Sequence, residues 1–257
     1  MTTGWVERFS IKGRKALVTG ASKGIGAEIA RVFAEAGADI VAVGRDQADL
    51  EATAEAVRGF GRKCLVITAD LADAQATRDA GEKALAEWGT IDILINNAGI
   101  ARLGPALDLS LDYWEETFAV NVRAPFLLSQ VLAPKMIEQR WGKIVMISSQ
   151  AGVRALDDHS AYSASKGAIN MLTKGLMVEW AKHNVQVNAI CPTVVMTPMG
   201  KEVWGLEEKG GPMREATPLK RFGEPVEIAD CALYLASPAA ELINGEIIMA
   251  EGGFSSV

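Results

Sequence analysis

The sequence predicts an α/β fold, a doubly wound parallel sheet of about seven strands with helices on both faces. Short β-branched segments alternate with longer segments rich in Ala, Leu, Glu and Lys along most of the 257 residues. This alternation predicts parallel strands joined by right-handed crossovers. Hydrophobic residues make up 49% of the chain, enough to bury a sheet on both faces. We therefore expect a single domain over residues 1–257.

Six strands can be located from their apolar, β-branched runs. They are expected at Ala16–Thr19, Ile40–Val43, Cys64–Thr68, Ile91–Ile95, Ile144–Ser148 and Val185–Ile190. Helices are expected at Ile25–Ala36, Gln47–Val57, Ala74–Glu87, Leu111–Gln139, Ala161–Lys182 and Pro225–Ala236. Glycine and proline interrupt this alternation at about 193–217, where we expect a mobile loop over a substrate site.

The composition argues against several classes of protein. A net charge of −6 without a basic stripe disfavours a nucleic-acid partner. Cys64, Cys191 and Cys231 are widely spaced, and His159 and His183 are the only histidines, so we expect neither a disulfide framework nor a metal site. The sequence lacks both a cationic, apolar leader and an apolar stretch of about 18–20 residues. We therefore expect a cytoplasmic protein that does not enter a membrane.

Three glycines follow the first predicted strand in the segment Thr19–Gly26, with the spacing Gly-x-x-x-Gly-x-Gly. They lie where a strand must turn tightly into a helix whose N-terminal amides attract phosphate. The alternative is a plain tight turn, but the order of strand, loop and helix favours the pyrophosphate of a dinucleotide. The domain is therefore expected to be of the Rossmann type.

Further motifs follow in a characteristic order. Asn96–Gly99 comes after the fourth strand, Ser149 after the fifth, Tyr162 and Lys166 open the next helix, and Pro192–Thr197 follows the sixth strand. With the glycine loop, these segments make almost the whole chain resemble the short-chain dehydrogenase/reductase family. The resemblance implies four catalytic residues, Asn121, Ser149, Tyr162 and Lys166.

Tyr162 and Lys166 are four positions apart, so they share one helix face. A tyrosine has a pKa near ~10, and an adjacent ammonium lowers the pKa by stabilising the phenolate. Tyr162 is therefore expected to be the acid/base; the alternative is a packed ring beside a surface lysine. The resemblance implies that Ser149 hydrogen-bonds the substrate oxygen, Asn121 supports a water-mediated proton path and Lys166 holds the nicotinamide ribose. A strand-end cap for Ser149, and satisfaction of helix backbone groups for Asn121, remain alternatives.

The resemblance also implies cofactor contacts along the whole carboxyl edge of the sheet. The residues concerned are Gly20, Ser22, Lys23, Gly24, Ile25, Gly26, Arg45, Asp70, Leu71, Asn97, Ala98, Gly99, Tyr162, Lys166, Pro192, Val195 and Thr197. Members that prefer NAD usually carry an acid where this chain has Gly44, whereas Arg45 and Lys23 suit a 2′-phosphate. NADP(H) is therefore favoured; the alternative is NAD(H), with Asp46 on the ribose and both cations solvated.

Three shorter segments, 41–50, 158–162 and 192–197, resemble the dicarbonyl/L-xylulose reductase branch, with Thr193 where the wider family usually has glycine. The resemblance implies a substrate pocket formed by Ser149, Gln150, His159 and Trp204. His159 could instead be an exposed helix-start residue, and Trp204 could pack in the core or an interface.

The predicted function is hydride transfer between NADP(H) and a small ketose, polyol or dicarbonyl. The alternatives are an NAD-dependent polyol dehydrogenase, a 3-oxoacyl-carrier-protein reductase and a dinucleotide-binding regulator. The resemblance further implies a homotetramer.

Overall fold

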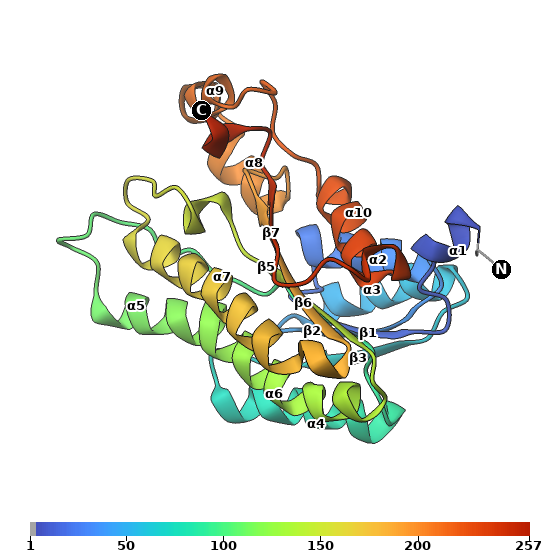
Figure 1. Ribbon diagram of the computed structural model, residues 1–257. Helices are drawn as coiled ribbons and strands as arrows, with labels where there is room; N and C mark the ends of the chain where they lie inside the picture. Colours follow the sequence, from blue (N-terminus) through green and yellow to red (C-terminus); the bar gives the residue numbers. More distant parts are fainter. Residues whose placement is uncertain (1–3) are drawn as a thin grey trace.

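A seven-stranded parallel sheet forms the centre of the computed structural model, which describes residues 4–257 (Figure 1). The strands lie in the order β3-β2-β1-β4-β5-β6-β7, and the predicted fold class is confirmed. Their bounds are β1 Lys15–Thr19, β2 Asp39–Gly44, β3 Cys64–Thr68, β4 Ile93–Asn96, β5 Gly142–Ile147, β6 Val185–Pro192 and β7 Ile247–Ala250. Met1 to Thr3 belong to the predicted domain but lie outside the described residues.

Helices cover both faces of the sheet (Figure 1). One face packs against α2 Gly24–Glu35, α3 Gln47–Gly59 and α10 Pro225–Ala236. The other packs against α4 Ala74–Trp88, α6 Ala124–Glu138 and α7 Ser160–Trp180. Alternate residues of each strand serve the two cores: in β1, Ala16 and Val18 join the first and Leu17 joins the second.

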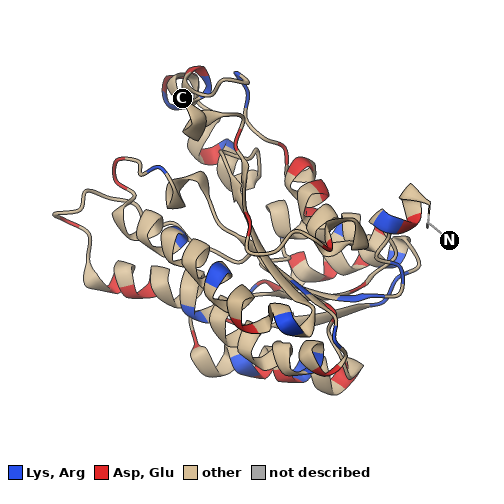
Figure 2. Cartoon of the chain, viewed as in Figure 1, with Lys and Arg blue, Asp and Glu red and all other residues tan. Residues whose placement is uncertain are grey.

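Smaller elements complete the described chain. α1 Trp5–Phe9 precedes β1, and four 3-10 turns occupy Gln150–Gly152, Ala181–His183, Pro238–Ala240 and Phe254–Ser256. Over the described residues, no helix combines the length and apolar character needed to cross a membrane. Lys, Arg, Asp and Glu are interspersed over the helices (Figure 2).

The helix expected over Leu111–Gln139 is wrong as a continuous α-helix. The chain instead forms α5 Leu111–Phe118, a π-helical turn Ala119–Arg123, and α6. Asn121 lies at the centre of the π-helical turn, and its side chain holds the backbone of Ile100. Because periodicity counts 3.6 residues per turn, it does not reveal a single wider turn within a helix.

The segment 193–217 contains two helices, α8 Pro198–Trp204 and α9 Glu207–Ala216, where the sequence suggested only a loop. The Thr197 side chain caps α8 by accepting a hydrogen bond from the Gly200 amide, at 3.0 Å. Glycines and Pro212 suggested irregular backbone, but a small hydrophobic cluster around Met213 packs this segment into helices. Strand β7 was also not located, because it is only four residues long and lies at the edge of the sheet.

Candidate active site

A cavity of about 260 Å³ lies at the carboxyl ends of the strands and is lined in part by residues of α8. In the sheet, β1 lies between β2 and β4, so the chain reverses its winding direction at this point. Such switch points open a crevice at the carboxyl edge of a doubly wound sheet. Many of the predicted site residues line this cavity: Ile25, Asn97, Gly99, Ser149, Gln150, His159, Tyr162, Lys166, Pro192, Val195, Thr197 and Trp204.

The glycine loop between β1 and α2 depends on glycine for two different reasons. Gly20 and Gly24 adopt φ of +63° and +61°, a conformation that strains any other L-residue. Gly26 has no such conformation, but a Cβ there would lie 2.2 Å from the carbonyl oxygen of Gly20. Both the turn and the approach of helix to strand therefore require small residues.

The N-terminus of α2 keeps its backbone amides available. Lys23 is its N-cap and makes no side-chain capping hydrogen bond. By contrast, Asp46 caps α3 and Asp73 caps α4 through their carboxylates. Free first-turn amides in a twelve-residue helix form an anion site, so the pyrophosphate of NAD(P) fits this loop. Ser22 lies in the same loop, half-buried.

Asn97 and Thr19 connect the glycine loop to the neighbouring strand. Asn97 donates from Nδ2 to the Thr19 carbonyl at 2.8 Å, and Thr19 Oγ1 accepts from the amides of Asn97 and Ala98, both at 3.0 Å. These bonds fix the ends of β1 and β4 on either side of the crevice. Asn97, predicted as a cofactor contact, thus also has a structural role, and Thr19 was missed as its partner.

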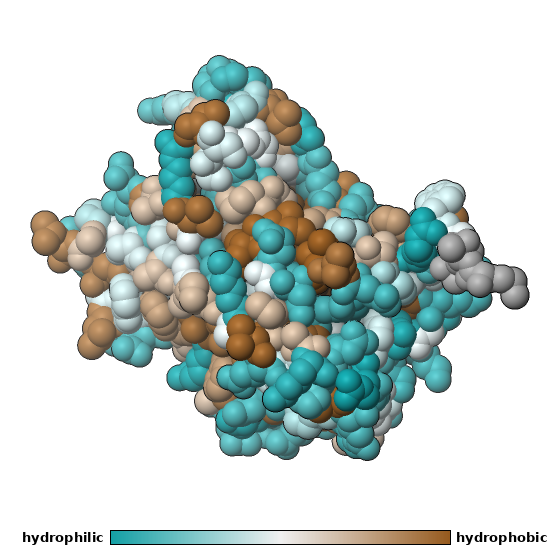
Figure 3. Space-filling model, viewed as in Figure 1, coloured by the Kyte–Doolittle hydropathy of each residue, from teal (hydrophilic) through white to brown (hydrophobic). Residues whose placement is uncertain are grey.

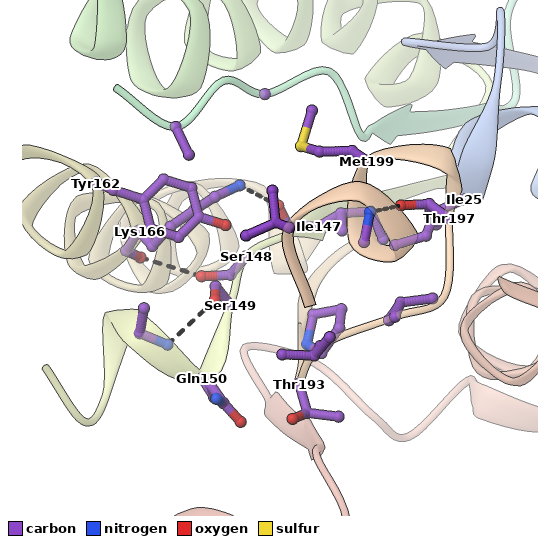
Figure 4. Close-up of a pocket in the computed structure, with 18 of the residues that line it drawn as sticks. Ile25, Ile147, Ser148, Ser149, Gln150, Tyr162, Lys166, Thr193, Thr197 and Met199 are labelled. Atoms are coloured by element: carbon purple, nitrogen blue, oxygen red, sulfur yellow. Dashed lines mark hydrogen bonds between the residues drawn. The ribbon is translucent and has the colours of Figure 1, made fainter. Parts of the chain in front are cut away.

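Tyr162, Lys166 and Ser149 meet at one end of the cavity (Figure 4). Lys166 Nζ lies 5.6 Å from the centre of the Tyr162 ring and donates to the Ile147 carbonyl at 2.8 Å. Ser149 Oγ accepts from the Ala151 amide at 3.1 Å, so this hydroxyl caps the 3-10 turn that follows it. The alternative interpretation of Ser149 as a cap is thus correct, while its O–H remains able to donate, and its hydrogen bond to a substrate oxygen stays a prediction.

Burial shifts the pKa values of Tyr162 and Lys166 in opposite directions. It raises the pKa of the Tyr162 phenol, and a hydrogen bond with Ser149 partly opposes this increase. It lowers the pKa of the Lys166 ammonium to about 8, because the low-dielectric surroundings disfavour the cation. For the protein chain by itself, the pKa of Tyr162 is shifted in the direction opposite to the expected decrease, because desolvation outweighs the hydrogen bond with Ser149. A cationic nicotinamide would supply a further charge that favours the phenolate.

Asn121 does not line the cavity but lies behind it. Its side-chain oxygen accepts from the Ile100 amide at 2.9 Å, and its nitrogen donates to the Ile100 carbonyl at 2.9 Å and to Ser165 Oγ at 3.0 Å. It thus satisfies backbone groups of the loop after β4, rather than those of its own helix. A Cβ on Gly99 would lie 3.4 Å from both Asn121 Oδ1 and Lys166 Nζ, so this loop packs tightly against the Tyr162 centre.

The residues predicted to select the cofactor lie farther along the sheet edge, beyond the cavity. Gly44 ends β2, and a Cβ there would lie 3.3 Å from Leu50 Cδ2. Arg45 and Lys23 are exposed, and neither forms an ion pair or side-chain hydrogen bond within residues 4–257. Asp46 uses one carboxylate oxygen to accept from the Asp49 amide at 3.0 Å. Two further predicted contacts follow β3: Asp70, which accepts from the Ala72 amide, and the buried Leu71.

The other predicted substrate residues, besides Ser149, also line the cavity. Gln150 is only 3% exposed, His159 is half-buried and immediately precedes α7, and Trp204 ends α8. Trp204 also packs against a cluster formed by Met213, Phe222 and Phe254, hereafter the lid cluster. It therefore lines the cavity and also packs in a core, and its contact with a substrate stays a prediction. Cavity residues without a predicted contact role include Leu156, Thr193, Val194, Met199 and Val203.

Residues 4–257 contain no cluster of three or more His, Cys, Asp or Glu side chains able to hold a metal ion. Cys64 and Cys231 are half-buried, and burial raises the pKa of each thiol to about 11. Thiols with raised pKa values are poor nucleophiles at neutral pH. Tyr162, Lys166 and Ser149, by contrast, line the cavity.

Comparisons with known proteins agree with this geometry. A family model described as Enoyl-(Acyl carrier protein) reductase matches residues 20–255. The D-threitol dehydrogenase of Mycolicibacterium smegmatis is 42% identical over 96% of this chain and 95% of its own length. The L-xylulose reductase of Bos taurus is 42% identical over 95% and 97%, and the NAD-dependent glycerol dehydrogenase of Listeria innocua is 41% identical over 98% of each chain.

Solved structures are equally similar. The gluconate 5-dehydrogenase of Burkholderia cenocepacia, in complex with NADP and tartrate, superposes with a TM-score of 0.94 at 34% identity, covering 99% of this chain and 100% of its own. The chain belongs to the short-chain dehydrogenase/reductase family. It is an NAD(P)-dependent oxidoreductase, and its resemblance to the L-xylulose reductase branch is confirmed.

Proposed function

We propose that this enzyme interconverts a four- or five-carbon ketose and its polyol, with NADP(H) as the preferred cofactor. One observation carries the proposal: Tyr162, Lys166 and Ser149 share a cavity with the buried, polar side chain of Gln150. A buried polar group in the wall of a cavity favours a substrate with several hydroxyls over an apolar one. Relatives at 41–42% identity are named for threitol, xylulose, glycerol and erythrulose.

The side chains of the cavity manage the proton and orient the substrate. The bound cofactor supplies the hydride in reduction and accepts it in oxidation. Tyr162 gives a proton to the substrate oxygen in reduction and removes it in oxidation. The Lys166 cation, 5.6 Å from the ring centre, favours the phenolate, and Ser149 donates a hydrogen bond to the same substrate oxygen. Asn121 holds the Ile100 backbone and is a positioning residue.

Preference for NADP(H) rests on the end of β2. Arg45 is exposed and forms no ion pair within residues 4–257, although its charge contributes to the lowered pKa of Glu116, and the close approach of Leu50 leaves little room for an acidic side chain at Gly44. A guanidinium without an ion pair suits a 2′-phosphate. We expect Arg45→Ala to weaken NADPH binding by about 1–3 kcal/mol and to leave NADH binding nearly unchanged. An equal increase in the dissociation constants of NADPH and NADH would contradict recognition of the 2′-phosphate by Arg45.

Initial rates test the substrate proposal. Oxidation of NADPH and NADH is followed with xylulose, erythrulose, diacetyl and a 3-oxoacyl thioester, and the reverse reaction with xylitol and threitol. We expect the largest kcat/KM for NADPH with a ketose. A rate confined to the thioester would favour an acyl-chain reductase, and a rate confined to NAD and polyols would identify a polyol dehydrogenase and contradict the role of Arg45.

We also propose that the chain assembles as a homotetramer. Large apolar side chains are exposed on α5, α6 and α7, including Leu111, Phe126, Met171 and Val178. Figure 3 shows apolar surface among polar residues over the region of α5 and α7. Exposed apolar patches of this kind favour contacts between subunits. Light scattering coupled to size-exclusion chromatography tests the proposal, and a monomer mass would contradict it.

A further inference from the structure

Two oxygen atoms on side chains that line the cavity are buried without a hydrogen-bond partner in the described part of the chain. They are Oε1 of Gln150 and Oγ1 of Thr193. Both side chains line the cavity, and in Figure 4 both lie on the side away from the Lys166 amine. Buried polar atoms are nearly always paired in proteins, because leaving one unpaired costs about 1–3 kcal/mol. The pair therefore suggests a ligand group that completes both hydrogen bonds.

The backbone that carries both side chains is held by hydrogen bonds, so the points from which they enter the cavity are fixed. The Gln150 carbonyl accepts from the amides of Val153 and Arg154 at 2.9 and 2.8 Å, which locks the 3-10 turn. The Thr193 amide donates to the Ala250 carbonyl of β7 at 3.2 Å. Both residues thus stand on ordered elements, one beside β5 and the other at the end of β6. Recognition groups held in this way cost little conformational entropy on binding.

The chemistry of the two oxygens defines what they can bind together. Gln150 Oε1 only accepts a hydrogen bond, whereas the Thr193 hydroxyl can donate one. A hydroxyl group is the smallest ligand group that donates to the first and accepts from the second. We infer that Thr193 is a specificity residue that, together with Gln150, binds a substrate hydroxyl away from the reacting carbon. The inference rests on the proposed function, because it concerns the substrate of the same cavity.

This arrangement should reject substrates that lack the distal hydroxyl. Such a substrate would leave Oε1 and Oγ1 unpaired and dry, which penalises its binding and its transition state alike. Apolar residues such as Leu156 and Val194 line the same cavity and offer no replacement partner. Thr193 therefore should separate polyhydroxylated substrates from diols and diketones of equal length.

The test compares two substrates in matched variants. Wild type, Thr193→Val and Thr193→Ser are assayed with threitol and with butane-2,3-diol, which lacks the terminal hydroxyls. Valine has nearly the shape of threonine without its hydroxyl, and serine keeps the hydroxyl. We expect T193V to lower kcat/KM for threitol by about tenfold or more, and to leave the diol unchanged. Thr193→Ser should retain most of the preference for threitol.

The outcomes separate the inference from the proposed function. If wild type turns over threitol but T193V keeps the same ratio of the two substrates, the inference is overturned and the function stands. Equal losses on both substrates would likewise overturn it, because they indicate a structural hydroxyl, for example one bridged by water. A wild type that acts on neither polyols nor ketoses overturns the function and the inference together. Should T193V not fold, Gln150→Met removes the other half of the pair and is judged by the same ratio.

Discussion

The cofactor side and the substrate side of the cavity are built in different ways. On the cofactor side, Gly20, Gly24 and Gly26 fix the backbone, and hydrogen bonds between Thr19 and Asn97 join two central strands. On the substrate side, α8 and α9 lie outside the sheet and are held by the lid cluster, which has only three buried members. Figure 1 shows this part as a separate mass above the sheet edge, beside the C-terminal segment.

This difference explains which side can vary. Backbone conformations and close glycine contacts tolerate almost no substitution, because a Cβ would meet main-chain atoms. A small hydrophobic cluster can be repacked at modest cost, and each repacking moves the cavity wall. We infer that the cofactor side preserves the reaction class, while the substrate side determines which carbonyl enters. Tyr162 and Ser149 lie where the two sides meet.

Removing the Tyr162 hydroxyl should have the largest effect of all, since this residue lies where the two sides of the cavity meet. We expect Tyr162→Phe to lower kcat by about 10³-fold or more, because it removes the hydroxyl proposed to exchange the proton. Titration of NADPH fluorescence should show nearly unchanged cofactor affinity. Turnover within tenfold of wild type would disprove the acid/base assignment.

Gly26→Ala tests the rigidity of the cofactor side. The added methyl group would lie 2.2 Å from the Gly20 carbonyl oxygen, so the helix must move away from the loop. We expect a loss of about 1–3 kcal/mol in the free energy of unfolding, as in overpacked cores, and cofactor binding weakened at least tenfold. Urea unfolding and fluorescence titration measure the two effects.

Gly59→Ala is the matched control, because it adds the same methyl group to a helix of the cofactor side. Gly59 ends α3, and a Cβ there has no neighbour within 4 Å. This variant should keep cofactor affinity and be slightly more stable, since alanine favours helix more than glycine by about 0.5–1 kcal/mol. Similar behaviour of the two variants would mean that the close approach at Gly26 is unimportant.

Phe254→Ala tests the substrate side, and its effect should be smaller and selective. Phe254 is 5% exposed within the lid cluster, and Arg154 Nη1 donates to its carbonyl at 2.6 Å. Truncation leaves a cavity beneath Trp204, so the wall formed by α8 loses its support. We expect KM for the ketose to rise about tenfold with an unchanged dissociation constant for NADPH. Phe254→Leu, which refills most of the space, should restore KM; a parallel loss of cofactor affinity would contradict independence of the two sides.

The same contrast explains what the sequence could predict. The strands and the glycine loop were predictable because buried parallel strands are apolar throughout and the loop requires glycine at fixed spacing. Tyr162 and Lys166 followed from helix spacing together with the resemblance. The π-helical turn at Asn121 and helices α8 and α9 were not predictable, because they depend on contacts with Ile100 and Phe254 that are distant in sequence. Thr193 stood out only as a departure from the family pattern, and its unpaired hydroxyl became visible in three dimensions.

Lys143 offers the test with the smallest expected effect on activity, because it is a buried cation that does not line the cavity. It lies in β5, 1% exposed, and its amine is buried without a hydrogen-bond partner in the described part of the chain. Burial lowers its pKa from 10.5 to about 8; Glu241 opposes this decrease and Arg14 adds to it. Lys166 has a similarly lowered pKa, but it donates to Ile147 and lines the cavity.

We expect Lys143→Met to stabilise the protein near neutral pH without changing kcat or KM. Because the pKa of Lys143 is lower in the folded state, its stability cost is complete below about pH 8 and disappears as pH rises toward 10.5. The variant should therefore gain roughly 1–3 kcal/mol of unfolding free energy at pH 7, and little at pH 10. Urea unfolding at both pH values measures the gain. An equal gain at pH 7 and pH 10 would show that packing of the methionine, rather than removal of a buried charge, accounts for it. A pH-dependent gain without loss of activity would show that the buried charge of Lys143 destabilises the protein and serves no step of the reaction.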